Sequence, residues 1–187
     1  LEDTYHLEGR QVLLFVGRLI DIKNLFFLLD ALALVVNRYP KVILLFVGDG
    51  DQRVALERHA ERNGLADHVI FAGKKQGKDL YACYNVGQIF VLPSYYERFG
   101  AVVNEALLAG CYTLCSSAAG AACLVNPLEN GAIFDSHSKD GLVEQLTVAL
   151  DMTPVLSELR LKENKMLNSY DTYFANFMNR LDDLLNK

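Results

Sequence analysis

The chain has 187 residues, of which 51% are apolar and 22% are charged, with a formal net charge of −5. This composition predicts one folded domain with a sizeable core and excludes an intrinsically disordered chain. The acidic balance argues against wrapping a nucleic-acid polymer, which needs a broad basic face, but it leaves room for a small anion site. Apolar runs such as Val42 to Val47 are far too short to span a bilayer.

The first half of the chain alternates apolar runs with segments of helical spacing. The run 12–16 ends at Gly17 and predicts a strand that is buried on both faces. Residues 25–39 carry apolar side chains at helical spacing before Pro40, which predicts a helix. The run 42–47 predicts a second buried strand, because the turn sequence Gly48-Asp49-Gly50 ends it.

The same alternation continues to about residue 150. The further strands that we expect are 69–71, 89–92, 112–115 and 132–134, and the further helices are 51–63, 78–84, 101–109 and 140–150. Strand and helix in alternation indicate an α/β fold, a Rossmann-like parallel sheet with helices on both faces. We assign this domain to residues 1–153.

From 154 to 187 the pattern is helical only, and we predict a C-terminal helical segment there. It carries more apolar surface than a helix capping one sheet requires. We expect it to pack on this domain or to cross toward a second domain. The side chains that we expect to be partly exposed are Tyr173, Phe174, Phe177 and Leu181.

The four cysteines form no C-x-x-C pair, and we interpret them as free, buried thiols rather than metal ligands or catalysts. They are Cys83, Cys111, Cys115 and Cys123. Free thiols predict a reducing, cytoplasmic location. The sequence starts at Leu1 rather than Met and has no signal-peptide pattern, so we interpret it as a fragment of a longer protein.

Ligands of open parallel sheets bind outside the carboxyl ends of the strands, which directs attention to the loops there. The loop 17–24 carries Arg18 and Lys23, two cations that could hold a phosphate, although an ordinary solvated loop is an equal alternative. The turn at Gly48 lacks the G-x-G-x-x-G spacing, since position 53 is Arg. This disfavours a nicotinamide cofactor.

Two carboxylates flank the start of the helix expected at 101–109. Glu97 precedes it and Glu105 lies on its second turn, roughly 12 Å apart if the whole segment were helical. That is too far for the carboxylate pair of a glycosidase. The helix N-terminus between them favours a phosphate. The order carboxylate, phosphate site, carboxylate fits the sugar, diphosphate and ribose of a nucleotide sugar.

The segment E-R-F-G-A-V-V-N-E at 97–105 resembles the E-x7-E motif of retaining glycosyltransferases of the GT4 type, which have the GT-B fold. The resemblance covers nearly the whole chain. Its other motifs are G-R-L-I-D-I-K at 17–23, V-G-D-G at 47–50, F-A-G at 71–73 and P-S-Y-Y-E-R-F-G at 93–100. It implies that the chain is the C-terminal, donor-binding domain of such an enzyme.

The resemblance also implies a role for each matching residue. Arg18 and Lys23 match the cations that neutralise the donor diphosphate, Glu97 the carboxylate that contacts the donor sugar, and Glu105 the one that binds the ribose. The other donor-binding positions that it implies are Gly17, Gly73, Lys74, Phe99, Gly100 and Ala101.

Three positions depart from the family pattern. Asn24 replaces a common Gly, Tyr112 replaces a frequent Pro, and the Gly-Gly-x-x-Glu stretch reads Gly120-Ala121-Ala122-Cys123-Leu124, without an acid. This last change bears on sugar specificity and on activity, because the loop faces the donor in the family.

We therefore predict the donor half of a retaining glycosyltransferase, which moves a sugar from a nucleoside-diphosphate sugar to an acceptor such as a glycan or lipid. The alternatives are an epimerase or phosphorylase built on the GT-B fold, or a degenerate nucleotide-binding module. The expected partners are the donor and a missing N-terminal acceptor domain, which could also provide peripheral membrane contact. We expect no cofactor and no metal, and the fragment alone to be inactive.

Overall fold

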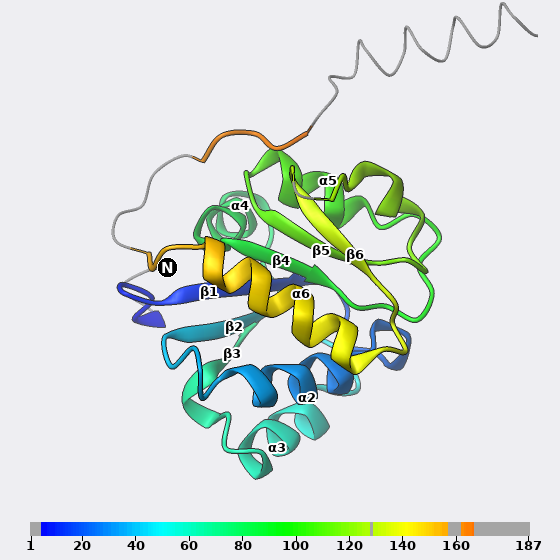
Figure 1. Cartoon of the computed structure of the whole chain (residues 1–187). Helices are drawn as coiled ribbons and strands as arrows, with labels where there is room; N and C mark the ends of the chain where they lie inside the picture. The colour runs from blue at the N-terminus through cyan, green and yellow to red at the C-terminus, as the bar shows by residue number, and fades with distance from the viewer. Residues whose placement is uncertain (1–4, 128, 157–161, 167–187) are drawn as a thin grey trace, which may run out of the picture.

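The computed structural model of the protein describes residues 5–127, 129–156 and 162–166 (Figure 1). Six strands form one sheet in the order β3-β2-β1-β4-β5-β6, and all neighbouring strands are parallel. The strands are β1 (Gln11–Val16), β2 (Val42–Val47), β3 (Val69–Gly73), β4 (Ile89–Leu92), β5 (Tyr112–Ser116) and β6 (Gly131–Phe134).

Five α-helices and three short 3₁₀ helices connect the described strands or follow them. The α-helices are α2 (Leu25–Val35), α3 (Arg53–Arg62), α4 (Gly77–Val86), α5 (Ala101–Leu108) and α6 (Lys139–Met152). The 3₁₀ helices are η1 (Asp21–Lys23), η2 (Ala66–His68) and η3 (Gly120–Leu124). Helix α2 contacts both α3 and α6, while α4 contacts β1 and α5 contacts β4 and β5 (Figure 1). No described helix combines the length and apolar character needed to cross a membrane.

The core explains why the central strands are apolar along their whole length. Every residue of β1, β2 and β4 is buried, because helices cover both faces of the sheet. Ser138 caps the N-terminus of helix α6, because its side-chain hydroxyl accepts a hydrogen bond from the Gly141 N–H (3.1 Å). The α/β, Rossmann-like prediction is therefore confirmed.

Helix α2 ends four residues earlier than the sequence predicts. The backbone N–H groups of Arg38 and Tyr39 both donate to the carbonyl of Val35, at 3.0 Å each, so the chain leaves the helix in a tight turn before Pro40. The 3₁₀ helix at Gly120–Leu124 was not predicted either, since no apolar periodicity marks so short an element.

The predicted helix from 154 onward is wrong where the structure describes it, at 154–156 and 162–166. These residues run as a non-helical strap along the amino-terminal edge of the sheet. The Leu156 N–H donates to the Arg10 carbonyl (2.6 Å), and the Lys165 N–H donates to the Leu107 carbonyl (2.8 Å). The remainder of the prediction, with Tyr173, Phe174, Phe177 and Leu181, lies outside the described residues, and the boundary at 153 stays a prediction.

Candidate functional site

The candidate site lies where the strand order reverses, between β1 and β4. This is the switch point at which open α/β sheets bind their ligands. The loops after these two strands, 17–24 and 93–100, lie side by side: the Tyr95 N–H donates to the Ile22 carbonyl (3.0 Å). Residues that are far apart in the sequence therefore share one edge of the sheet.

Lys23 and Glu97 meet across these two loops. The Lys23 ammonium forms an ion pair and a hydrogen bond with Oε2 of Glu97, and both side chains are mostly buried, 15% and 21% exposed. The backbone of Glu97 is also fixed, because its N–H donates to the Ala118 carbonyl (3.2 Å) and its carbonyl accepts from Gly120 N–H (3.0 Å). A cation and a carboxylate are thus held at one point.

Asn24, which replaces the common Gly, adopts the left-handed conformation with φ +57°. Asn tolerates this region better than most residues with a Cβ. Its buried side chain donates from Nδ2 to the Ser136 carbonyl (3.0 Å), in the loop after β6. The substitution therefore preserves the backbone conformation and adds a connection between two loops.

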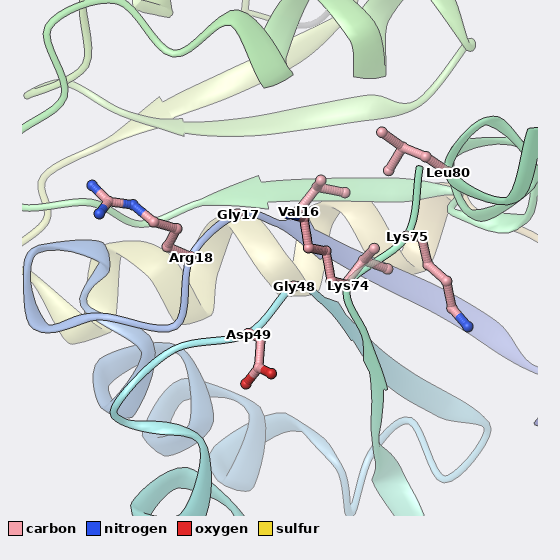
Figure 2. A pocket seen from close by; sticks show the side chains of 9 residues that line it. Val16, Gly17, Arg18, Gly48, Asp49, Lys74, Lys75 and Leu80 are labelled. Carbon is pink, nitrogen blue, oxygen red and sulfur yellow. The ribbon is translucent and has the colours of Figure 1, made fainter. Parts of the chain in front are cut away.

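A pocket of about 410 Å³ opens beside these loops, at the ends of β1 and β2 (Figure 2). Its lining is apolar at Val16, Val47 and Leu80 and basic at Arg18, Lys74 and Lys75, with Gly17, Gly48 and Asp49 completing it. In Figure 2 the side chains of Arg18 and Lys75 point to opposite sides of the pocket, and Leu80 lies across from Val16. An apolar floor with basic rims suits a flat ring that carries a polyanion.

Glycine lets two of the loop backbones touch in this region. A Cβ at Gly48 would lie only 1.8 Å from the Gly17 carbonyl oxygen. The Gly48 N–H also donates to the carbonyl of Gly73 (3.0 Å), which ends β3 at φ +70°. Gly73 is thus hydrogen-bonded to one residue of the pocket lining, Gly48, and directly precedes another, Lys74.

Helix α5 begins immediately after the Glu97 loop. Gly100 precedes it at φ +94°, where a Cβ would lie 3.1 Å from Leu92 Cδ2 and 3.2 Å from Glu97 Cγ. Phe99 and Ala101 are exposed on either side, and the Phe99 carbonyl accepts from Ala121 N–H (2.6 Å). The helix N-terminus therefore lies next to the Lys23–Glu97 pair and presents backbone N–H groups suited to an anion.

Glu105 lies on the second turn of α5, as predicted, and one of its oxygens is engaged by a residue that the sequence analysis missed. The Tyr84 hydroxyl on α4 donates to Oε2 of Glu105 (2.6 Å). Burial, followed by this hydrogen bond, raises the pKa of Tyr84 far above its ordinary value, so the phenol stays protonated and donates its proton to this hydrogen bond. A Tyr in an ordinary helical segment carries no sequence signal for such a contact.

The cysteines match the interpretation as free thiols, with one exception in burial. Cys83, Cys111 and Cys115 are buried, whereas Cys123 is exposed on η3. Burial raises the pKa of Cys115 to about 12, with smaller contributions from Cys123 and Glu97, so its thiol is inert at neutral pH. Within the described parts of the chain, no three His, Cys, Asp or Glu side chains gather as a possible metal site.

The predicted residues thus fall into three groups around one edge. Gly17, Arg18 and Lys74 line the pocket, while Lys23, Glu97, Phe99, Gly100 and Ala101 surround the start of α5. Glu105 is hydrogen-bonded to Tyr84 of α4, and Gly73 is hydrogen-bonded to Gly48 of the pocket lining.

Residues 2–166 match the family described as "Glycosyl transferases group 1". The chain belongs to this family. It is 33% identical over 170 residues to an uncharacterised glycosyltransferase of Methanocaldococcus jannaschii, covering 89% of this chain and 42% of that protein. The chain thus spans less than half the length of this curated relative.

Two solved structures share the fold, and one of them is described as a group 1 glycosyltransferase. The HepE protein of Anabaena, crystallised with UDP, has a TM-score of 0.78 at 22% identity, covering 99% of this chain and 51% of that one. The C-terminal domain of the LpcC protein from Francisella tularensis has a TM-score of 0.71 at 20% identity, covering 94% and 90%. The described α/β unit therefore corresponds in fold to the C-terminal, Rossmann-like domain of a GT-B protein.

Proposed function

We propose that this chain is the donor-binding domain of a retaining glycosyltransferase that uses a nucleoside-diphosphate sugar. The observation that carries the proposal is the convergence of Lys23, Glu97 and the start of α5 beside a pocket with basic rims. Membership of the group 1 family and the fold shared with a UDP complex support it.

In the proposed complex the nucleoside occupies the pocket, and the diphosphate extends toward the N-terminus of α5. Arg18, Lys23 and the helix N–H groups would stabilise the negative charge that develops on the β-phosphate as the anomeric bond breaks. This electrostatic role needs no metal, and we propose that none takes part. Glu97 would contact the sugar, and Glu105 would accept hydrogen bonds from the ribose.

In this proposal donor binding begins by breaking the ion pair between Lys23 and Glu97. Each charged group neutralises the other in the unliganded protein, which lowers the cost of holding both in a mostly buried site. A bound diphosphate would replace Glu97 as the partner of Lys23. Glu97 would then be free to turn toward the sugar hydroxyls, so the diphosphate and the sugar would bind cooperatively.

In this proposal a second, N-terminal domain is needed to bind the acceptor and to complete the catalytic cycle. Such a domain would close over the exposed loops after β1 and β4 and supply the acceptor site, with any peripheral membrane contact. Alone, the chain should bind the donor and transfer nothing. The free cysteines favour a reducing, cytoplasmic location.

Calorimetric titration with UDP, GDP and ADP tests the proposal. One diphosphate should bind, and Glu105→Ala should weaken its affinity roughly tenfold or more, because a charge-assisted hydrogen bond is lost. Glu144→Ala, an exposed glutamate on α6, is the matched control and should leave the affinity unchanged. If none of the three binds, the degenerate-module alternative, supported by the missing acid at 120–124, replaces the proposal.

A further inference from the structure

The two oxygens of the Glu105 carboxylate have different surroundings. Oε2 accepts the hydrogen bond from the Tyr84 hydroxyl (2.6 Å), whereas Oε1 accepts no hydrogen bond from the residues that the structure describes. Glu105 as a whole is exposed, while Tyr84 is only 1% exposed. A buried donor therefore anchors one side of an otherwise exposed carboxylate.

Tyr84 is itself held rigidly. Its ring packs beside Phe90 of β4, with a centroid separation of 6.3 Å. Its backbone carbonyl accepts a hydrogen bond from the Lys162 ammonium (3.0 Å), which arrives from the strap along the amino-terminal edge. Packing on a central strand and a charged donor on its carbonyl leave the phenol little freedom to move.

The direction of the helix explains how a residue near the end of α4 reaches this edge. Side chains on an α-helix tilt toward the helix N-terminus, and α4 begins at the carboxyl edge of the sheet. Leu80 lies one turn before Tyr84 on the same face and lines the pocket. Helix α4 therefore contributes one residue to the pocket and one to the neighbouring carboxylate.

We propose that Tyr84 is a positioning residue, which fixes the rotamer of Glu105 so that Oε1 faces the ribose of the donor. The inference rests on the proposed function of the site. Without the hydroxyl, Glu105 would sample other rotamers on the exposed face of α5, and each ribose hydrogen bond would then require the carboxylate to be ordered at the moment of binding. The loss should fall on the ribose contact and leave the base and phosphate contacts intact.

The test is a cycle that pairs Tyr84→Phe with removal of the ribose hydroxyls from the ligand. Calorimetry would compare whichever of UDP, GDP and ADP binds the wild type with its 2′,3′-dideoxy form. The wild type should prefer the ribose form by roughly tenfold or more, and Tyr84→Phe should reduce this preference to about threefold or less. Tyr81→Phe, an exposed tyrosine on the same helix, is the control and should keep the wild-type preference.

Each outcome has a distinct meaning. If Tyr84→Phe lowered the affinity for both ligands by the same factor, the preference between them would be unchanged. Tyr84 would then have only a structural role, which overturns the positioning role and leaves the proposed function standing. If wild-type protein bound both ligands equally, the ribose role of Glu105 would fail and the inference with it. Circular dichroism and the unfolding midpoint, measured on all variants, show whether the protein keeps its fold when Tyr84→Phe removes the hydroxyl and leaves the ring.

Discussion

Lys23 and Glu97 neutralise one another at the centre of the proposed site, although 74 residues separate them in the sequence. Neither residue type is unusual in a loop, and each alone has an ordinary solvated interpretation. Their contact at the switch point of the sheet, where open α/β sheets bind ligands, is what indicates a functional role. A diphosphate that binds there must compete with Glu97 for the ammonium.

This competition leads to opposite expectations for two variants. Lys23→Ala should weaken binding of a nucleoside diphosphate at least roughly tenfold, because a charge-assisted contact is lost. Glu97→Gln should tighten it by about two- to fivefold, because the ammonium is released and a nearby negative charge disappears. Calorimetry with the diphosphate that binds the wild type measures both. Weaker binding by Glu97→Gln would contradict the competition.

At the scale of elements, the loops after β1 and β2 are packed backbone to backbone. The Leu19 N–H donates to the Asp49 carbonyl (2.9 Å), and the Gln52 N–H donates to the Leu19 carbonyl (3.0 Å). The pairing of β1 with β2 therefore continues past the strands into the wall of the pocket. A Cβ would overlap the facing backbone at two positions, Gly48 (1.8 Å from the Gly17 carbonyl oxygen) and Gly50 (2.3 Å from the Leu19 carbonyl oxygen).

Gly48→Ala should consequently cost at least about 4 kcal/mol of unfolding free energy, because its Cβ would overlap the Gly17 carbonyl oxygen and no flexible side chain can yield. Gly64→Ala is the matched control, with φ +70° and no atom within 4 Å of the added Cβ. It should cost only the conformational strain, about 1–2 kcal/mol. Urea unfolding followed by circular dichroism would measure both, and equal losses would show that the loops can separate easily.

The elements themselves were largely predictable, because runs such as 12–16 and 42–47 are buried on both faces and must be apolar throughout. The strap at 154–156 and 162–166 was mispredicted for a related reason. Its apolar residues suit a helix equally well, but Leu156 pairs its backbone with Arg10, some 146 positions away, and local periodicity cannot detect such a partner. The same holds for the contact between Tyr84 and Glu105.

The loops of the candidate site were located through their positions after strands, and their chemistry through the resemblance at 97–105. Motifs identified Arg18, Lys23, Glu97 and Glu105 as a group. They gave no information on which of them touch, because the contacts depend on the strand order and on how α4 and α5 pack. At Asn24 the sequence shows only that Asn replaces Gly. The structure explains why Asn is tolerated there, through its left-handed backbone conformation and the hydrogen bond from its side chain to the Ser136 carbonyl.

At the scale of the whole molecule, buried thiols and phenols make stability sensitive to alkaline pH. The pKa of Cys115 is raised from 9.0 to about 12, chiefly by burial. A raised folded-state pKa means that the unfolded chain loses its proton first, so the stabilisation is fully present below pH 9 and is lost as pH rises toward 12. Burial also raises the pKa values of Cys83, Cys111 and Tyr84, whereas it lowers that of Lys162, which acts in the opposite sense.

The free energy of unfolding should therefore fall steadily between pH 9 and 10.5. Cys115→Ala should remove about 1.4 kcal/mol per pH unit from that slope in this window, which corresponds to one proton. Urea unfolding at several pH values compares the two proteins, and the difference isolates this thiol from the other titrating groups. An unchanged slope would mean that Cys115 ionises in the folded protein as readily as in the unfolded one.

The strap and the start of β1 have a mechanical consequence. The chain enters the α/β unit beside Gly9 and returns to the same place at Leu156, where the two backbones are hydrogen-bonded, and Lys165 is hydrogen-bonded to Leu107 at the same edge (Figure 1). Gly9, Leu156 and Lys165 thus all lie at the edge of the sheet opposite the pocket. If the unit rotated about this edge, the pocket would be displaced, because it lies at the opposite edge of the sheet. A small angular change at the strap would translate into a large displacement of Lys23, Glu97 and the start of α5.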